Sequence, residues 1–154
     1  MTPRSRTNQL LYQAELLLDT QTGDDEHAEA RRMAAEEGAL ALAELALESL
    51  LREVTEHARL ERHAWRELLG PEGAGIAELH RLRELAAQPG SWLAWLIGKL
   101  EALHASEGAA RRSGGAARGL IAVGSAAALG EELRGCLGEA KAEIAALRET
   151  SQEW

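Results

Sequence analysis

The chain has 154 residues, a mass of 16.6 kDa, a charged fraction of 27% and a net charge of −8. This length fits one domain and leaves no room for a second independent core. The acidic balance disfavours a role in coating DNA or RNA, because binding to a phosphate backbone depends on clustered Lys and Arg.

The aliphatic residues are strongly biased toward helix formers. The sequence contains 26 Leu and 30 Ala but only 2 Val and 4 Ile, and it lacks Phe. Strands need β-branched and aromatic side chains to cover a pleated surface, whereas Leu and Ala favour helices. We therefore expect a single all-α domain over residues 1–154, built as a bundle of four to six helices with one long central helix.

The first predicted helix runs from near Ser5 to Gln21, because Leu10, Ala14 and Leu17 recur at helical spacing on one face. After a turn with Gly and Asp residues, a long second helix is predicted over about 25–69, unless Gly38 breaks it. Its apolar stripe consists of Leu40, Leu47, Leu51, Val54, Ala58, Trp65 and Leu69. Between residues 39 and 51 other leucines cover further sides of this helix, so we expect that part to be buried on several sides at the centre of the bundle.

Three further helices are predicted after the Gly70–Gly75 loop. A short one covers about 76–86 and a fourth follows Ser91, a good N-cap residue. The last one spans about 131–152, where apolar residues step by three and four. Residues 107–119, rich in Gly, Ser and Arg, are expected to form a mobile loop.

Three segments carry a resemblance to a known family. They are Arg6-Thr7-Asn8-Gln9-Leu10-Leu11-Tyr12, Gln88-Pro89-Gly90-Ser91-Trp92-Leu93 and Arg148-Glu149-Thr150-Ser151-Gln152-Glu153-Trp154. Together they resemble a small bacterial family of uncharacterised helical proteins, known only as a domain of unknown function. The resemblance implies a helical fold and a cytoplasmic bacterial protein, and it transfers no catalytic residue.

The spacing from Arg52 to His57 matches that of the helical HEPN ribonucleases, in which Arg and His act at the RNA phosphate. Five residues on a straight helix place two side chains about 140° apart, so these two would converge on one phosphate only if the helix broke. We expect instead that Arg52 pairs with Glu48 and Glu56 on a solvated helix face. The ribonuclease stays as an alternative function.

Other chemistry has little support in the sequence. Glu101 and His104 have the spacing of one half of a di-iron motif, but such sites need two such motifs and two further Glu residues. The five histidines lack metal-ligand spacing, so we expect no metal and no cofactor. Cys136 lies beside Leu133 and Leu137, which favours a small buried hydrophobe over a reactive thiol. We expect the protein not to be an enzyme.

The tryptophans are the candidate interaction residues. Trp92, Trp95 and Lys99 share a helix face, and the first interpretation is core packing with an extended Lys stem. The alternative is an exposed anchor for another protein, since Trp is enriched at interface hot spots. Trp65 and Trp154 lie on the apolar edges of their own helices and are candidates for the same cluster.

The leading hypothesis is a non-catalytic interaction or adaptor protein that forms a homodimer. It rests on more apolar helix faces than one core of this size can bury. An acidic regulator of a basic nucleic-acid-binding protein is a further alternative. The N-terminal residues contain no apolar stretch of signal-peptide length, and no window approaches the roughly 20 apolar residues of a membrane span. We therefore expect a cytoplasmic protein with no membrane partner and no direct nucleic-acid partner.

Overall fold

The computed structural model describes residues 1–71, 73, 75–112 and 128–152. Over these residues it is helical and contains no strand, which confirms the all-α prediction. The elements are α1 (Pro3–Leu18), α2 (Ala28–Val54), the 3₁₀ helix η1 (Glu56–Ala58), α3 (Trp65–Leu68), α4 (Ala77–Ala87), α5 (Trp92–His104) and α6 (Leu129–Gln152).

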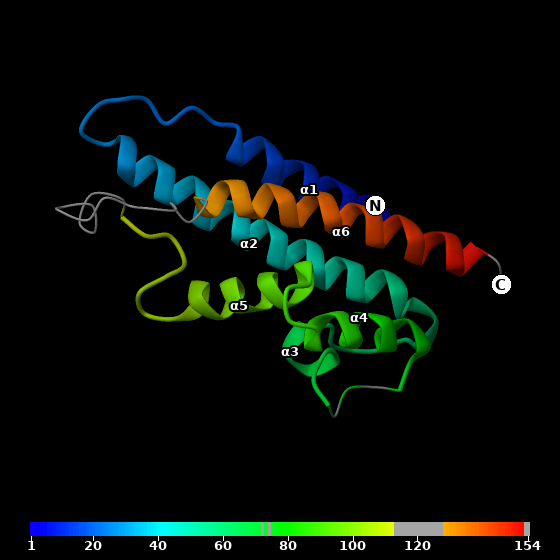
Figure 1. The fold of residues 1–154 in the computed structure, drawn as a ribbon. Coiled ribbons are helices and arrows are strands. Elements are labelled where there is room, and N and C mark those ends of the chain that lie inside the picture. Colours follow the sequence, from blue (N-terminus) through cyan, green and yellow to red (C-terminus); the bar gives the residue numbers. More distant parts are fainter. Residues whose placement is uncertain (72, 74, 113–127, 153–154) are drawn as a thin grey trace.

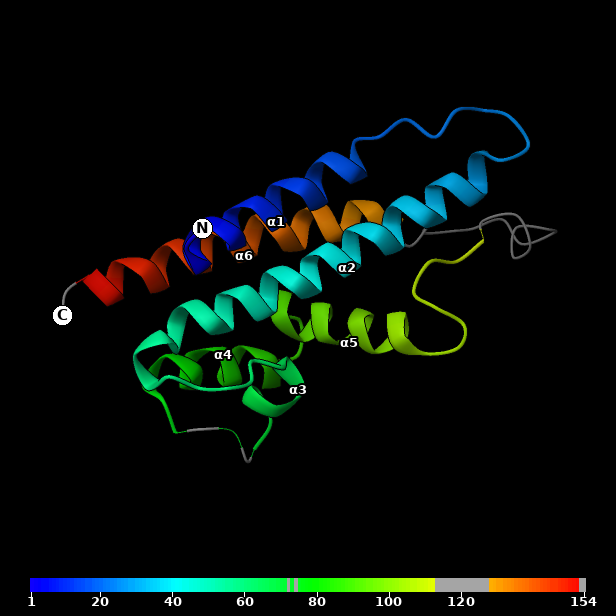
Figure 2. The ribbon, with the colours of Figure 1, turned by 180° about the vertical axis from the view of Figure 1, so that it is seen from behind.

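The three longest helices, α1, α2 and α6, run side by side along one axis (Figure 1). Helix α1 packs mainly on α2, while α5 packs against α2 and α6 from the other side. The view from behind places α3 and α4 near the C-terminal end of α2 (Figure 2). The start of α1 and the end of α6 lie at this same end of the bundle.

Helix α2 is the long central helix, and Gly38 does not interrupt it. Its 27 residues extend over about 40 Å. A Cβ atom at Gly38 would lie 2.8 Å from Leu17 Cδ2. This glycine therefore serves close packing between α1 and α2 rather than a break in the helix.

The prediction that this helix continues to Leu69 is wrong. Helix α2 ends at Val54, and Arg59 adopts a left-handed backbone conformation with φ 52°. The chain then turns back, so that Trp65 and Leu68 enter the core from α3. Apolar residues recur at the same intervals in the sequence in two different cases. In one, a single helix continues; in the other, the chain reverses and a second helix buries the same residues.

One hydrophobic core joins all six α-helices. Its largest fully buried apolar side chains are Leu10, Leu40, Leu50, Leu51, Leu79, Leu82, Leu93, Leu100, Leu133 and Leu137. Each such leucine contributes roughly 1.5–3 kcal/mol through burial. The expectation that residues 39–51 are buried on several sides is wrong at Leu45, whose exposed fraction is 46%.

The start of α5 confirms the predicted cap. The Ser91 hydroxyl accepts a hydrogen bond from the Ala94 backbone N–H at 3.0 Å. Helices α4 and α6 begin and end within two residues of their predicted bounds. Of the expected loop over 107–119, residues 107–112 are non-helical and residues 113–119 lie outside the described part of the chain.

Candidate functional site

Two of the candidate tryptophans belong to the core. Trp65 is 5% exposed and Trp92 is 8% exposed. Trp95 is half-buried, and its indole Nε1 donates to Glu132 Oε2 at 2.8 Å. Trp154 lies outside the described residues. For the described tryptophans, core packing is therefore the main role.

Lys99 packs against one of these rings. Its ammonium group lies 5.8 Å from the centroid of the Trp95 ring, within the range of a cation–π contact. The lysine is half-buried, as expected for an extended stem that follows an apolar face. The Trp95 indole thus joins α5 to α6 through Glu132, and the Lys99 ammonium covers its ring.

The Glu44 carboxylate organises a polar cluster between α2, α3 and α5. It accepts a hydrogen bond from Trp65 Nε1 at 2.8 Å, and His104 Nε2 lies 2.9 Å from both of its oxygens. The Glu44 side chain is 18% exposed and that of His104 is 53% exposed. Because the three side chains are paired with one another, we assign this cluster a role in positioning the helices.

Arg52 and His57 lie in different elements, because α2 ends between them. The expectation that one straight helix carries both residues is therefore wrong, although the structure gives no hydrogen bond between these two described residues. Burial first, and the Arg52 charge second, lower the pKa of His63.

The predicted salt bridges of Arg52 are also absent. Among the described residues, no carboxylate lies within 4.0 Å of its guanidinium, although the Arg52 charge weakly favours the ionised form of Glu48. Arg52 is exposed and lines a cleft instead of pairing along its own helix.

This cleft lies between the start of α1 and the C-terminal half of α2. It has a volume of about 330 Å³ and is lined by Met1, Thr2, Pro3, Arg6, Leu10, Leu45, Glu48, Ser49 and Arg52. Met1 is 86% exposed and Leu45 is 46% exposed, so apolar surface faces solvent here. We refer to it as the α1–α2 cleft.

At one side of the cleft, a buried hydrogen-bond network joins α1 to α2. Thr7 Oγ1 lies 2.8 Å from Ser49 Oγ, and both hydroxyls lie within 3.0 Å of the Pro3 carbonyl oxygen. Thr7 is fully buried. A buried hydroxyl pair of this kind has few alternative partners, so it fixes how the first turn of α1 sits on α2.

The charged side chains that line the cleft have weak interactions with groups of opposite charge. Burial first, and the Glu44 carboxylate second, raise the pKa of Glu48. Arg6 donates to the neutral Gln9 amide oxygen at 2.6 Å. The cleft thus combines two arginines and one partly desolvated carboxylate with exposed apolar side chains.

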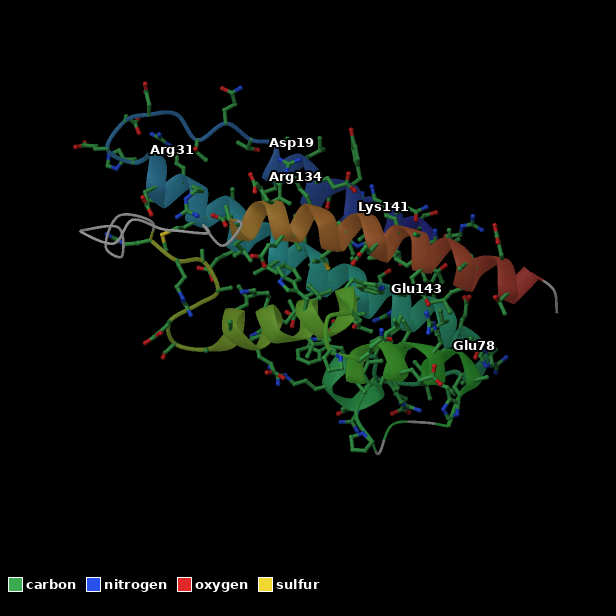
Figure 3. All side chains as sticks on the ribbon, in the orientation of Figure 1. Asp19, Arg31, Glu78, Arg134, Lys141 and Glu143 are labelled. Atoms are coloured by element: carbon green, nitrogen blue, oxygen red, sulfur yellow. The ribbon has the colours of Figure 1, made fainter. Side chains whose placement is uncertain are left out.

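Ion pairs at the surface connect α6 to α1. Arg134 forms an ion pair with Asp19, and Lys141 forms one with Glu15. Figure 3 places Asp19 and Arg134 next to each other where α1 ends and α6 begins. Farther along, Arg148 binds both carboxylate oxygens of Glu53.

The remaining candidates carry no site in the described chain. Glu101 is exposed and His104 pairs with Glu44 rather than with it. No group of three or more His, Cys, Asp or Glu side chains suited to a metal ion occurs among the described residues. Burial raises the pKa of the Cys136 thiol to about 12, which fits the predicted buried hydrophobe.

Leu45 is one of the cleft residues that sequence reasoning missed. It was assigned to a buried part of the central helix, and its neighbours Ala46 and Leu47 are indeed buried. The available signal was its position: Leu45 lies off the apolar stripe and one turn before Glu48. Helical spacing alone does not state which of several apolar faces lacks a partner.

Comparison with known proteins gives one match. A model of a family of unknown function, DUF6586, matches residues 1–154. No curated protein and no solved structure matches the chain. No helix of the described residues is long and apolar enough to cross a membrane. The match extends over the whole chain, and the chain therefore belongs to the DUF6586 family of unknown function.

Proposed function

We propose that this chain is a non-catalytic helical interaction protein that associates with a second copy of itself. The observation that carries the proposal is the distribution of exposed apolar side chains. Within the described residues, all four large exposed hydrophobic side chains belong to the first two helices and the residues before them: Met1, Tyr12, Leu16 and Leu45. Single exposed apolar side chains are ordinary, but Met1 and Leu45 line the same cleft, and Tyr12 and Leu16 lie one turn apart on α1. This distribution on one helix pair favours a protein-binding surface.

The alternatives from the sequence gain less support. The ribonuclease needs Arg52 and His57 at one phosphate, and the cleft that Arg52 lines does not include His57. The acidic regulator needs free carboxylates, but on α2 Glu44 binds Trp65 and His104, and Glu37 accepts from the Ala109 N–H. These carboxylates are occupied within the chain.

Sedimentation velocity over a hundredfold range of concentration tests the proposal. We expect the mass to rise from 16.6 kDa toward twice that value. The triple variant Tyr12→Ser, Leu16→Ser, Leu45→Ser should remain monomeric at the highest concentration, while the matched control Gln13→Ser should associate like the unmodified chain. A constant monomer mass for the unmodified chain would overturn self-association.

Incubation with RNA tests the catalytic alternative. We expect no cleavage. Cleavage that is lost in both Arg52→Ala and His57→Ala would overturn the non-catalytic assignment and support the ribonuclease.

A further inference from the structure

The α1–α2 cleft presents its charged and apolar groups in a fixed order along α2. Leu45, Glu48 and Arg52 follow one another at intervals of three and four residues, so they occupy one side of the helix over about 10 Å. Helix α1 runs antiparallel to α2 here, since Leu17 contacts Gly38 and Thr7 bonds Ser49.

Because of this direction, Met1 lies toward the Arg52 end of the cleft and Leu10 toward the Leu45 end. The most exposed apolar side chain of the described chain, Met1, is thus next to a guanidinium without a carboxylate partner in the described residues. At the other end, the exposed Leu45 lies one turn from Glu48.

The order of Glu48 and Arg52 along α2 is complementary to itself. If a second copy is rotated by 180° about an axis through the cleft midway between Glu48 and Arg52, its α2 runs antiparallel to the first. Arg52 of each copy then faces the partner's Glu48, and Leu45 of each copy faces the partner's Met1. A two-fold interface uses the same patch on both copies, so each contact occurs twice.

We infer that the α1–α2 cleft is a two-fold interface in which a second copy of the chain docks antiparallel, held by reciprocal Arg52–Glu48 ion pairs and reciprocal Leu45–Met1 contacts. The inference rests on the self-association proposed above and names its surface. Docking would place the partner's Arg52 against Glu48, which is partly desolvated beside Glu44 and forms no ion pair within 4.0 Å among the described residues of the single chain.

Charge reversal tests the reciprocal pairs. In Arg52→Glu, each of the two reciprocal pairs would consist of two acidic groups, and in Glu48→Arg each would consist of two basic groups. Like charges that face each other across an interface oppose association, so each variant alone should associate at least about tenfold more weakly than the unmodified chain.

An equimolar mixture of the two variants provides the decisive measurement. Every cross-copy pair in the mixed dimer is Glu with Arg, so sedimentation velocity should show association restored to within about threefold of the unmodified chain. The double variant Arg52→Glu, Glu48→Arg should also associate. Exposed reversals outside the cleft, Arg62→Glu and Glu139→Arg, are the controls and should change nothing.

Recovery in the mixture cannot arise from misfolded chains, so it would support the inference even if one variant is less stable. Association of the unmodified chain that both reversals leave unchanged would overturn this interface and leave self-association standing. A chain that stays monomeric at every concentration would overturn the interface together with the proposed self-association.

Discussion

Replacing Arg148 by Met should destabilise the bundle, because this guanidinium joins three helices. Arg148 Nε donates to Glu53 Oε1 at 2.6 Å and Nη2 donates to Oε2 at 3.1 Å, which connects α6 to α2. Arg148 Nη1 also donates to Asn8 Oδ1 on α1 at 2.9 Å. The side chains of Arg148 and Glu53 are only 17% and 13% exposed.

The size of the effect follows from this burial. Removing one partner of a fully buried pair costs about 3–5 kcal/mol, and exposed pairs contribute about 0.2–1 kcal/mol. The Arg148–Glu53 pair lies nearer the buried limit, and Met keeps the apolar stem of the side chain. We expect Arg148→Met to lower the free energy of unfolding by about 2–3 kcal/mol, which corresponds to a fall in Tm of roughly 5–10 °C for a domain of this size.

A double-mutant cycle of Arg148→Met with Glu53→Gln, followed by urea denaturation, measures the free energy of interaction between the two side chains. We expect a coupling free energy of about 1.5–2 kcal/mol. The control cycle uses Arg81→Met and Glu143→Gln, whose ion pair is more open because the Arg81 side chain is 51% exposed. If the coupling at Arg148–Glu53 is no larger than at this control pair, the argument from burial is refuted.

Three further predictions concern single side chains. Thr7→Val should lower the free energy of unfolding by about 1–2 kcal/mol in urea denaturation, because it removes the donor of one of the two hydrogen bonds of the buried Ser49 hydroxyl, which keeps only the Pro3 carbonyl. Ser91→Ala should cost about 1 kcal/mol in the same assay through loss of the cap of α5. The Cys136 thiol, with its pKa raised to about 12, should be almost wholly protonated at pH 8 and should react with a disulfide reagent only as fast as the chain opens.

Each of these has an outcome that contradicts it. Thr20→Val removes an exposed hydroxyl that bonds the Leu16 carbonyl, and an equal loss there would show that burial of Thr7 is irrelevant. An unchanged unfolding midpoint in Ser91→Ala would mean that the cap does not stabilise α5. Cys136 labelling at the rate of a free thiol in the folded chain would contradict the buried environment.

The helical content and several helix ends could be predicted because they depend on local chemistry. Leu and Ala favour helices wherever they stand, Ser91 caps the N–H groups of the next turn, and Gly70-Pro71 cannot continue a helix. The buried cysteine could also be predicted, since Leu133 and Leu137 lie on the same side of its helix.

The end of α2 at Val54 and the exposure of Leu45 were decided by tertiary structure. Periodicity records which residues are apolar, but it does not record whether Trp65 reaches the core along one helix or after the chain turns at Arg59. Likewise, Leu45 and the buried Leu47 are the same residue type, and only the paths of the helices packed on α2 determine which side of α2 lacks a cover.

The sequence by itself determined that this chain folds into helices, because helix formation follows from residue preferences and contacts three or four positions apart. Only the tertiary structure decided that Asn8, Glu53 and Arg148 meet and that Arg52 lines a cleft with Met1 and Leu45. These groups are separated by up to 140 residues. Their proximity depends on how whole helices pack, and no local preference encodes that distance.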